Sequence, residues 1–210
     1  KLKSGGYVPA GFSPAGSNPS APDAMFMYGG TTHKLEVKLN MAADYGQGTL
    51  NYSQGVWTLG GANTAAAQEL RTLMRAVGVE PFVNRVWGVQ GPPNKGTVIP
   101  AQFTQAMVTE DYRKFADKFV AIPSSALHSY YASKGTYYIQ VGGYGLYYMA
   151  ANPAGLDVPQ FTPGLRVRIR TKRGGSTPIY NYRFTTALQV TQRPARSSVD
   201  IDRNLDFLVE

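Results

Sequence analysis

Two acidic residues and a lysine form the sharpest chemical pattern in this 210-residue chain. The pair Pro22-Asp23 is followed, after twelve residues, by Glu36-Val37-Lys38, the one Asp/Glu-x-Lys triplet in the sequence. Two carboxylates suit a hard divalent cation such as Mg²⁺ (or Mn²⁺), which prefers oxygen ligands and keeps bound waters. A neighbouring lysine can orient or deprotonate such a water and can stabilise charge that develops on a phosphate. The pattern therefore favours hydrolysis of a phosphodiester.

A β-hairpin is the element that would bring these side chains together. Residues 24–28 (AMFMY) form a short apolar run, 29–32 (GGTT) are typical of a turn, and 34–39 (KLEVKL) alternate polar and apolar side chains. Because side chains two apart share one face of a strand, Glu36 would project together with the lysine that follows it. The turn would fold the two strands so that Asp23 lies beside Glu36 at a sheet edge.

The same pattern also fits an ordinary half-exposed strand. In that interpretation Leu35 and Val37 face the core, whereas the charged residues around them face water. Asp23 would then be a turn residue that follows a proline. These residues alone do not separate the two interpretations, and the basic composition of the chain favours the first.

The spacing PD-x12-ExK, placed on a hairpin, resembles the motif of the PD-(D/E)xK nuclease superfamily, which includes restriction endonucleases. The resemblance covers residues 22–38. It implies that Asp23 and Glu36 are metal ligands and that Lys38 is the catalytic lysine. It further implies a Mg²⁺-dependent deoxyribonuclease of the restriction-endonuclease type, with DNA as its partner. A homodimer is expected for that type, because double-strand cleavage needs two active sites.

Other family features are less evident near the motif. The helix and strand that usually precede the PD pair have no counterpart in residues 1–22, and residues 43–59 show turn and strand patterns rather than a helix. Gln47 and Tyr52 resemble a glutamine–tyrosine pair of some exonuclease-like members, with a spacing that differs by one residue. Gln47 is therefore a candidate accessory residue, and so is His33, which could bind phosphate or metal beside the proposed site.

The order of elements predicts an α+β fold with a central mixed β-sheet flanked by helices. In this prediction extra C-terminal strands join a restriction-endonuclease-like core. Residues 1–22, rich in Gly, Ser and Pro, predict a flexible arm or loop, and residues 23–210 a single domain with a basic, strand-rich part at about 136–210. Helical patterns cover 64–77, 102–120 and 124–132, and further strand patterns cover 136–141, 144–149, 165–171, 179–190 and 205–209.

The net charge of +8 favours a polyanionic partner, of which nucleic acid is the commonest. On the strand predicted at 165–171, basic side chains alternate with uncharged ones, so they would project from one face, and residues 160–197 contain no acidic residue. A phosphate backbone would suit that face; the alternatives are a solvated face or an edge strand guarded by charge. The expected nucleic-acid contacts are Arg166, Arg168, Arg170, Lys172, Arg173, Arg183 and Lys134.

The composition excludes several kinds of site. With no cysteine and two histidines, the chain cannot build a thiolate nucleophile, a cysteine-ligated metal or a three-histidine metal centre. No window approaches 18 uninterrupted apolar residues, so we expect no transmembrane helix and no membrane partner. A cytoplasmic location in a bacterium, an archaeon or a phage-infected cell is expected.

Two rival functions remain open at this point. A viral or phage capsid-like protein would suit the Gly/Pro/Ser arm, the many short strands and the basic balance. A non-catalytic nucleic-acid-binding module would use the same arginine strand, with tyrosines that can stack on bases.

Overall fold

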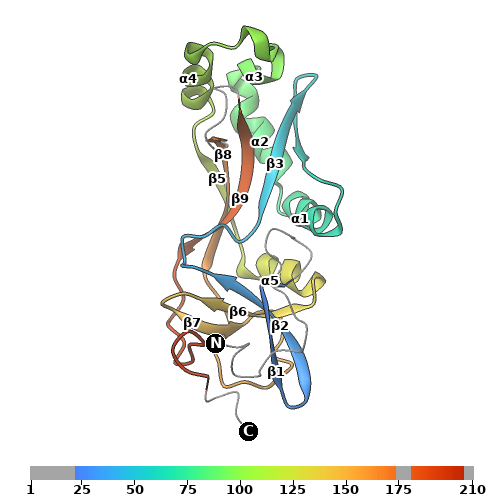
Figure 1. Ribbon diagram of the computed structural model, residues 1–210. Coiled ribbons are helices and arrows are strands. Elements are labelled where there is room, and N and C mark those ends of the chain that lie inside the picture. The colour runs from blue at the N-terminus through green and yellow to red at the C-terminus, as the bar shows by residue number, and fades with distance from the viewer. Residues whose placement is uncertain (1–21, 174–180, 206–210) are drawn as a thin grey trace.

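The computed structural model describes residues 22–173 and 181–205, and its strands form two separate sheets (Figure 1). A mixed four-stranded sheet has the order β1-β2-β6-β7, and an antiparallel five-stranded sheet has the order β4-β3-β9-β8-β5. The strands are β1 (Ala24–Tyr28), β2 (Thr31–Lys38), β3 (Gln47–Ser53), β4 (Val56–Gly60), β5 (Lys118–Ile122), β6 (Thr136–Val141), β7 (Gly145–Tyr148), β8 (Gly164–Arg173) and β9 (Tyr182–Gln192).

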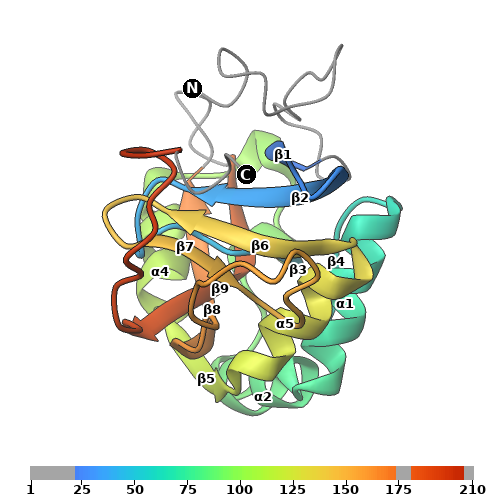
Figure 2. The same ribbon diagram turned by 90° about the horizontal axis from the view of Figure 1, so that it is seen from below.

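Helices pack on one face of the five-stranded sheet and between the two sheets (Figures 1 and 2). The helices are α1 (Ala65–Ala76), α2 (Val79–Trp87), α3 (Asn94–Thr97), α4 (Gln105–Lys114) and α5 (Ser124–Ser133), with short 3-10 turns η1 (Gly88–Gln90) and η2 (Pro100–Gln102). Among the described helices, none is long and apolar enough to cross a membrane.

The α+β class is confirmed, but the prediction of one central sheet is wrong. Residues 39–123, which lie between β2 and β6, supply three strands to a second sheet instead of returning to the first. The basic strands β8 and β9 also join this second sheet, so they do not extend the sheet that carries Glu36. The predicted arm lies outside the described residues apart from Pro22, and the predicted strand at 205–209 does so apart from Leu205.

The predicted hairpin is confirmed, with a tighter turn than expected. Gly29 and Gly30 have φ values of 55° and 70°, which glycine adopts without strain. Tyr28 therefore pairs directly with Thr31. Thr31 and Thr32, which were predicted as part of the turn, belong to β2 instead. At the other end of the ladder Ala24 lies opposite Leu35, which places Asp23 next to Glu36.

The strand that bears Glu36 is held on its other side by a distant segment. β2 pairs in parallel with β6, and a parallel pair requires a long crossover, whose last element is α5. The predictions of a helix at 124–132 and a strand at 136–141 are confirmed. The α5–β6 unit thus brings the end of a helix to the face of β2 that carries the charged residues.

The helix predicted at 64–77 is confirmed as α1, and Thr64 caps it by accepting a hydrogen bond from the Ala67 amide at 3.3 Å. The helix predicted at 102–120 is wrong beyond Lys114. There α4 ends, and Lys118–Ile122 forms β5 by pairing with β8. The i, i+4 spacing of Phe115 and Phe119 fits a helix, but pairing with β8 decides the outcome.

The main core fills the space between the helices and the covered face of the five-stranded sheet. Its centre is an aromatic cluster in which Trp57 lies 5.0–5.4 Å, between ring centroids, from Trp87, Phe115 and Phe184. A smaller core lies on the far face of the four-stranded sheet and includes Leu35. Both faces of the four-stranded sheet therefore pack against other parts of the chain, although Met27 of β1 and Val37 of β2 remain exposed. One face of the five-stranded sheet, by contrast, carries polar side chains.

Candidate active site

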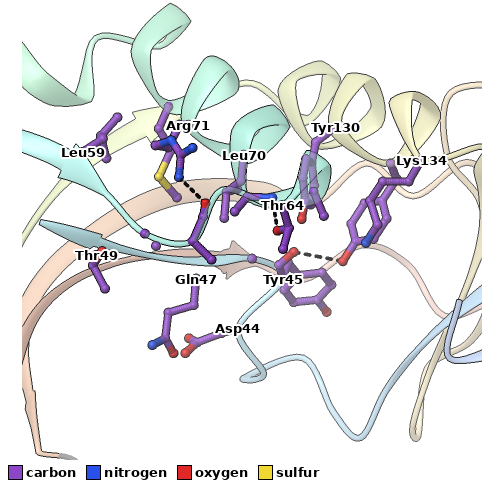
Figure 3. Close-up of a pocket in the computed structure, with 18 of the residues that line it drawn as sticks. Asp44, Tyr45, Gln47, Thr49, Leu59, Thr64, Leu70, Arg71, Tyr130 and Lys134 are labelled. Carbon is purple, nitrogen blue, oxygen red and sulfur yellow. Dashed lines mark hydrogen bonds between the residues drawn. The ribbon is translucent and has the colours of Figure 1, made fainter. Parts of the chain in front are cut away.

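A cavity of 610 Å³ is lined by residues of both sheets and of helices α1 and α5. Figure 3 shows Leu70 and Arg71 of α1 on one side of it, Tyr130 of α5 and Lys134, the residue after α5, on another, and Tyr45 below Tyr130 and Lys134. Sequence analysis did not single out Arg71, whose guanidinium donates to the Ala62 carbonyl at 2.9 Å. The cavity therefore combines apolar walls with a few charged groups, as ligand sites commonly do.

The three residues of the acidic–basic motif all line this cavity. The Lys38 ammonium lies 2.6 Å from Glu36 Oε1, and the Asp23 carboxylate accepts a hydrogen bond from the Val37 amide at 3.0 Å. Asp23 is thus fixed to the backbone between the two other charged residues. The convergence expected from the hairpin is present.

Burial along β2 contradicts the ordinary half-exposed strand. Glu36 is 7% exposed, whereas Val37 is 41% exposed. The alternation is therefore the reverse of what that interpretation requires at these two positions. Both faces of the four-stranded sheet are covered, so the polar face of β2 turns into the cavity rather than into solvent.

Tyr131 of α5 holds the Glu36 carboxylate in place. Its hydroxyl lies 3.0 Å from Glu36 Oε1 and 2.9 Å from the Tyr45 carbonyl, and it can donate its one proton to either. Burial raises the pKa of Tyr131 well above its usual value, and the negative charge of Glu36 raises it further. Tyr131 consequently remains a hydrogen-bond donor at all physiological pH values. Sequence analysis missed this role because the two partners are 95 residues apart.

Lys134, at the end of α5, places a second ammonium in the same cavity. Its Nζ lies 4.9 Å from the ring centroid of Tyr131 and 5.2 Å from that of Tyr130. Burial lowers the pKa of Lys134; the negative charge of Glu36 opposes this shift, and the positive charge of Lys38 adds to it. Lys134, predicted from the sequence as a nucleic-acid contact, lies in the same cavity as Glu36 and Lys38.

The two candidate accessory residues have different positions. His33 lies on the opposite face of β2, stacked on Phe26 at 5.2 Å and in edge contact with Tyr138 at 5.7 Å, so it does not line the cavity. Burial lowers the pKa of His33. Gln47 does line the cavity and accepts a hydrogen bond from the Lys172 ammonium at 2.7 Å.

The basic strand β8 projects its charged side chains from one face, as predicted, because Leu165, Val167 and Ile169 are buried on the other. The edge-strand alternative is wrong, since β8 pairs with both β5 and β9. Several of these cations already have partners. Arg168 forms an ion pair with Asp117, Arg170 lies 3.3 Å from Asp44, and Arg166 donates to Gln189 at 3.0 Å.

The more exposed cations lie toward one end of this face. Lys172 and Arg183 are exposed and lie directly opposite each other in the ladder between β8 and β9. Arg173, another of the predicted contacts, alternates to the opposite face of β8, where it lies beside Tyr112 of α4. Arg183 also lines the cavity that contains Glu36. Positive charge therefore continues from the carboxylate site onto the polar face of the five-stranded sheet.

The cavity offers a magnesium ion two carboxylate ligands rather than a complete set of ligands. Within residues 22–173 and 181–205, no three His, Cys, Asp or Glu side chains gather into a metal-binding group. Asp23 and Glu36 form a pair, and no described residue donates a hydrogen bond to Asp23 Oδ1 or Glu36 Oε2. Mg²⁺ is commonly bound by one or two carboxylates together with substrate phosphate oxygens and water. The pair therefore fits a magnesium ion that is completed by its substrate.

Comparisons with known proteins give no relative. A scan against protein-family models and searches of curated proteins and of solved structures find no significant match to this chain.

Proposed function

We propose that this protein is a Mg²⁺-dependent nuclease that hydrolyses DNA phosphodiesters at the cavity of Asp23, Glu36 and Lys38. One observation carries the proposal: two carboxylates and an ammonium meet in a cavity, with Lys38 Nζ 2.6 Å from Glu36 Oε1. Burial of charged groups costs free energy, so buried charges of this kind usually serve binding, catalysis or the structure. The neighbouring basic face supports a polyanionic substrate.

Hydrolysis forms a bond between a water oxygen and phosphorus and breaks the bond to the leaving oxygen, while the proton lost by the water passes through solvent to that leaving oxygen. Asp23 and Glu36 would hold Mg²⁺, which supplies a Lewis acid for the phosphate and a more acidic water when it is bound. Lys38 would orient the attacking water and stabilise the negative charge that grows on the phosphate. Tyr131 would keep the Glu36 carboxylate in one orientation through its 3.0 Å hydrogen bond.

The restriction-endonuclease type is the subtype that we propose. The superfamily has a helix after its ExK strand, and α5 supports this wider resemblance because it contacts Glu36 through Tyr131, although residues 39–123 intervene. The subtype itself rests on the resemblance of the PD-x12-ExK spacing. A restriction-type enzyme would act as a homodimer and cut within the duplex at defined sites. An exonuclease would degrade linear DNA from its ends.

The test is incubation of the folded protein with supercoiled plasmid and linear DNA, with Mg²⁺ or with EDTA. We expect nicked or linear plasmid with Mg²⁺ and no product with EDTA. Discrete fragments would establish internal cutting at specific sites, whereas shortening of linear DNA alone would establish an exonuclease. Intact DNA under every metal condition would contradict the proposal.

A non-catalytic nucleic-acid-binding protein is the second candidate, and the basic face of β8 and β9 is the observation that favours it. This candidate predicts affinity that persists in EDTA and falls steeply with salt, with no cleavage. The same incubation, combined with a binding measurement in EDTA, separates it from the nuclease.

The lowered pKa of Lys134 predicts an alkaline limit to DNA affinity. Below its pKa the ammonium attracts phosphate, and above it the attraction is lost. Because burial lowers this pKa, the loss should begin at a lower pH than the ordinary value of about 10.4 would give. Arginine stays charged beyond about pH 12, so Lys134→Arg should shift the alkaline fall in affinity to higher pH.

The measurement is fluorescence anisotropy of a labelled DNA duplex in EDTA, from pH 7.5 upward. Wild-type protein and Lys134→Arg should agree near neutrality and separate on the alkaline side. If the two curves of affinity against pH superimpose, a group other than Lys134 causes the fall in affinity at alkaline pH.

A further inference from the structure

A second pocket, of 430 Å³, lies where β3 and β9 separate. The ladder between these strands ends at Leu50 and Phe184; beyond it β3 continues to pair with β4, and β9 with β8. Figure 1 shows the end of β3 parted from β9, with α3 nearby. The opening is also lined by Pro93, which precedes α3, and by Lys95 and Gly96 of α3.

Two cations line this pocket without a carboxylate partner. Lys95 of α3 lies with its Nζ 4.9 Å from the ring centroid of Tyr182, and Arg183 of β9 is exposed. In the described part of the chain, neither forms an ion pair. Burial lowers the pKa of Lys95, and the positive charge of Arg183 adds to this effect, while Asp111 opposes it. The two like charges therefore share a partly desolvated space.

Asp111 is the acidic group that acts on Lys95, and its oxygens are already used. Oδ1 accepts from the Asn94 amide at 2.8 Å, and Oδ2 accepts from the Lys95 amide at 3.0 Å and from the Tyr182 hydroxyl. The carboxylate is thus bound to the backbone of α3 rather than to the Lys95 ammonium. An anion from outside would relieve the repulsion between Lys95 and Arg183.

The second pocket adjoins the candidate active site and shares part of its wall. Thr49 and Arg183 line both the 610 Å³ cavity and the 430 Å³ pocket. Arg166, Arg168 and Arg170, farther along the same face, have partners within the protein. The unmatched positive charge is therefore concentrated beside the shared wall, and the side chain of Asn51 adds a polar group to the pocket.

We propose that the pocket between β3 and β9 binds a backbone phosphate of the substrate, next to but distinct from the phosphate that is cleaved, through Lys95 and Arg183. This inference rests on the proposed nuclease function. It assigns Lys95, a residue with no place in the carboxylate site, to substrate binding. It also gives a direction to the substrate, which would run from Glu36 past Arg183 toward α3.

The test compares Lys95→Gln, Arg183→Gln and the control Arg85→Gln, which removes an exposed charge from α2 on the helix-covered side of the sheet. Affinity for a labelled DNA duplex is measured in EDTA over a series of salt concentrations, with folding checked by circular dichroism. Each pocket variant should bind about tenfold more weakly at low salt. The slope of log K against log salt should become shallower by about 0.9 for each lost phosphate contact. Arg85→Gln should match the wild type.

Chemical labelling gives a second measurement that needs no variant. An amine-acylating reagent is applied with and without DNA, and each lysine is quantified by mass spectrometry. DNA should protect Lys95 more than Lys118, which is exposed at the start of β5 on the far edge of the five-stranded sheet. Equal protection of the two lysines would argue against the pocket.

The outcomes separate this inference from the proposed function. If the wild type binds and cuts DNA while both pocket variants behave like Arg85→Gln, the pocket proposal is overturned and the nuclease stands. If the variants weaken binding by a protein that never cuts, the pocket is supported as a nucleic-acid site and the nuclease is overturned. If the wild type neither binds nor cuts, both proposals fail.

Discussion

Replacing Lys38 by alanine should lower the rate of DNA cleavage by about 100-fold or more, because the loss of one preorganised group that stabilises developing charge typically costs 10²- to 10³-fold. The side chain lies at the rim of the cavity, 16% exposed, with its ammonium against Glu36. Its loss leaves Glu36 with the hydrogen bond from Tyr131, so the fold should survive. Cleavage of supercoiled plasmid under single-turnover conditions measures the effect, and urea denaturation measures the stability.

Glu36→Gln should be measured alongside Lys38→Ala, because it tests the proposed metal ligand. The amide keeps an oxygen for the Tyr131 hydroxyl but removes the negative charge that would hold the metal. Cleavage should fall as strongly as in Lys38→Ala, whereas affinity for DNA in EDTA should rise, because one negative charge is lost beside Lys38 and Lys134. Lys38→Ala should weaken affinity instead. If Lys38→Ala and Glu36→Gln both cut DNA at the rate of the control variant Arg85→Gln, the nuclease proposal is eliminated.

The parts of the site that lie close together in sequence could be predicted from the sequence. The Gly29-Gly30 turn and the alternation that follows it specify a hairpin through local backbone preference. That hairpin is sufficient to bring Asp23 to Glu36 and to set Lys38 on the same face. The helix α5 and the strand β6 also have clear local patterns, and their bounds were predicted closely.

The parts that depend on distant pairing could not be predicted. Alternation along β2 says that Glu36 and Val37 face opposite ways, but not which of the two faces the interior. The choice is made by α5, which brings Tyr131 to Glu36 from 95 residues away. The Trp57 cluster likewise joins β4, α2 and β9, and no local pattern indicates that these segments share a core.

The charge pattern of β8 indicated which way its arginines project, but not which groups neutralise them. The alternation at Arg166, Arg168 and Arg170 predicted that the arginines share a face, and this is confirmed. The absence of acidic residues from the same stretch favoured an external anion as their partner over a solvated face or an edge strand. Asp44 and Asp117, which come from other segments, balance two of them instead. A stretch without acids in sequence is therefore not a surface without acids, and the stronger case for an external phosphate lies at Lys95 and Arg183.

The second large effect is expected from a glycine that touches no charged side chain of the site. The Gly142 amide donates to the Lys38 carbonyl at 2.8 Å, and a Cβ added to Gly142 would lie 2.1 Å from the Leu39 carbonyl oxygen. Both contacts are with backbone, which cannot rotate away as a side chain can. Gly142→Ala should therefore displace the end of β2 and cost about 2–3 kcal/mol of unfolding free energy. Cleavage should fall with it, because Lys38 is carried on the displaced segment.

Gly143→Ala is the matched control, one residue further along the chain. Gly143 has a φ of 74° and no atom within 4 Å of an added Cβ, so alanine there meets backbone strain but no neighbour. It should cost about 1 kcal/mol and leave cleavage at the wild-type level under conditions where the protein is fully folded. Urea denaturation and single-turnover cleavage of both variants distinguish the two causes. If Gly142→Ala loses stability but cuts as fast as Gly143→Ala, then the end of β2 does not have to be held rigidly for cleavage, and the position of Lys38 along that strand is less critical than the 2.6 Å contact with Glu36 implies.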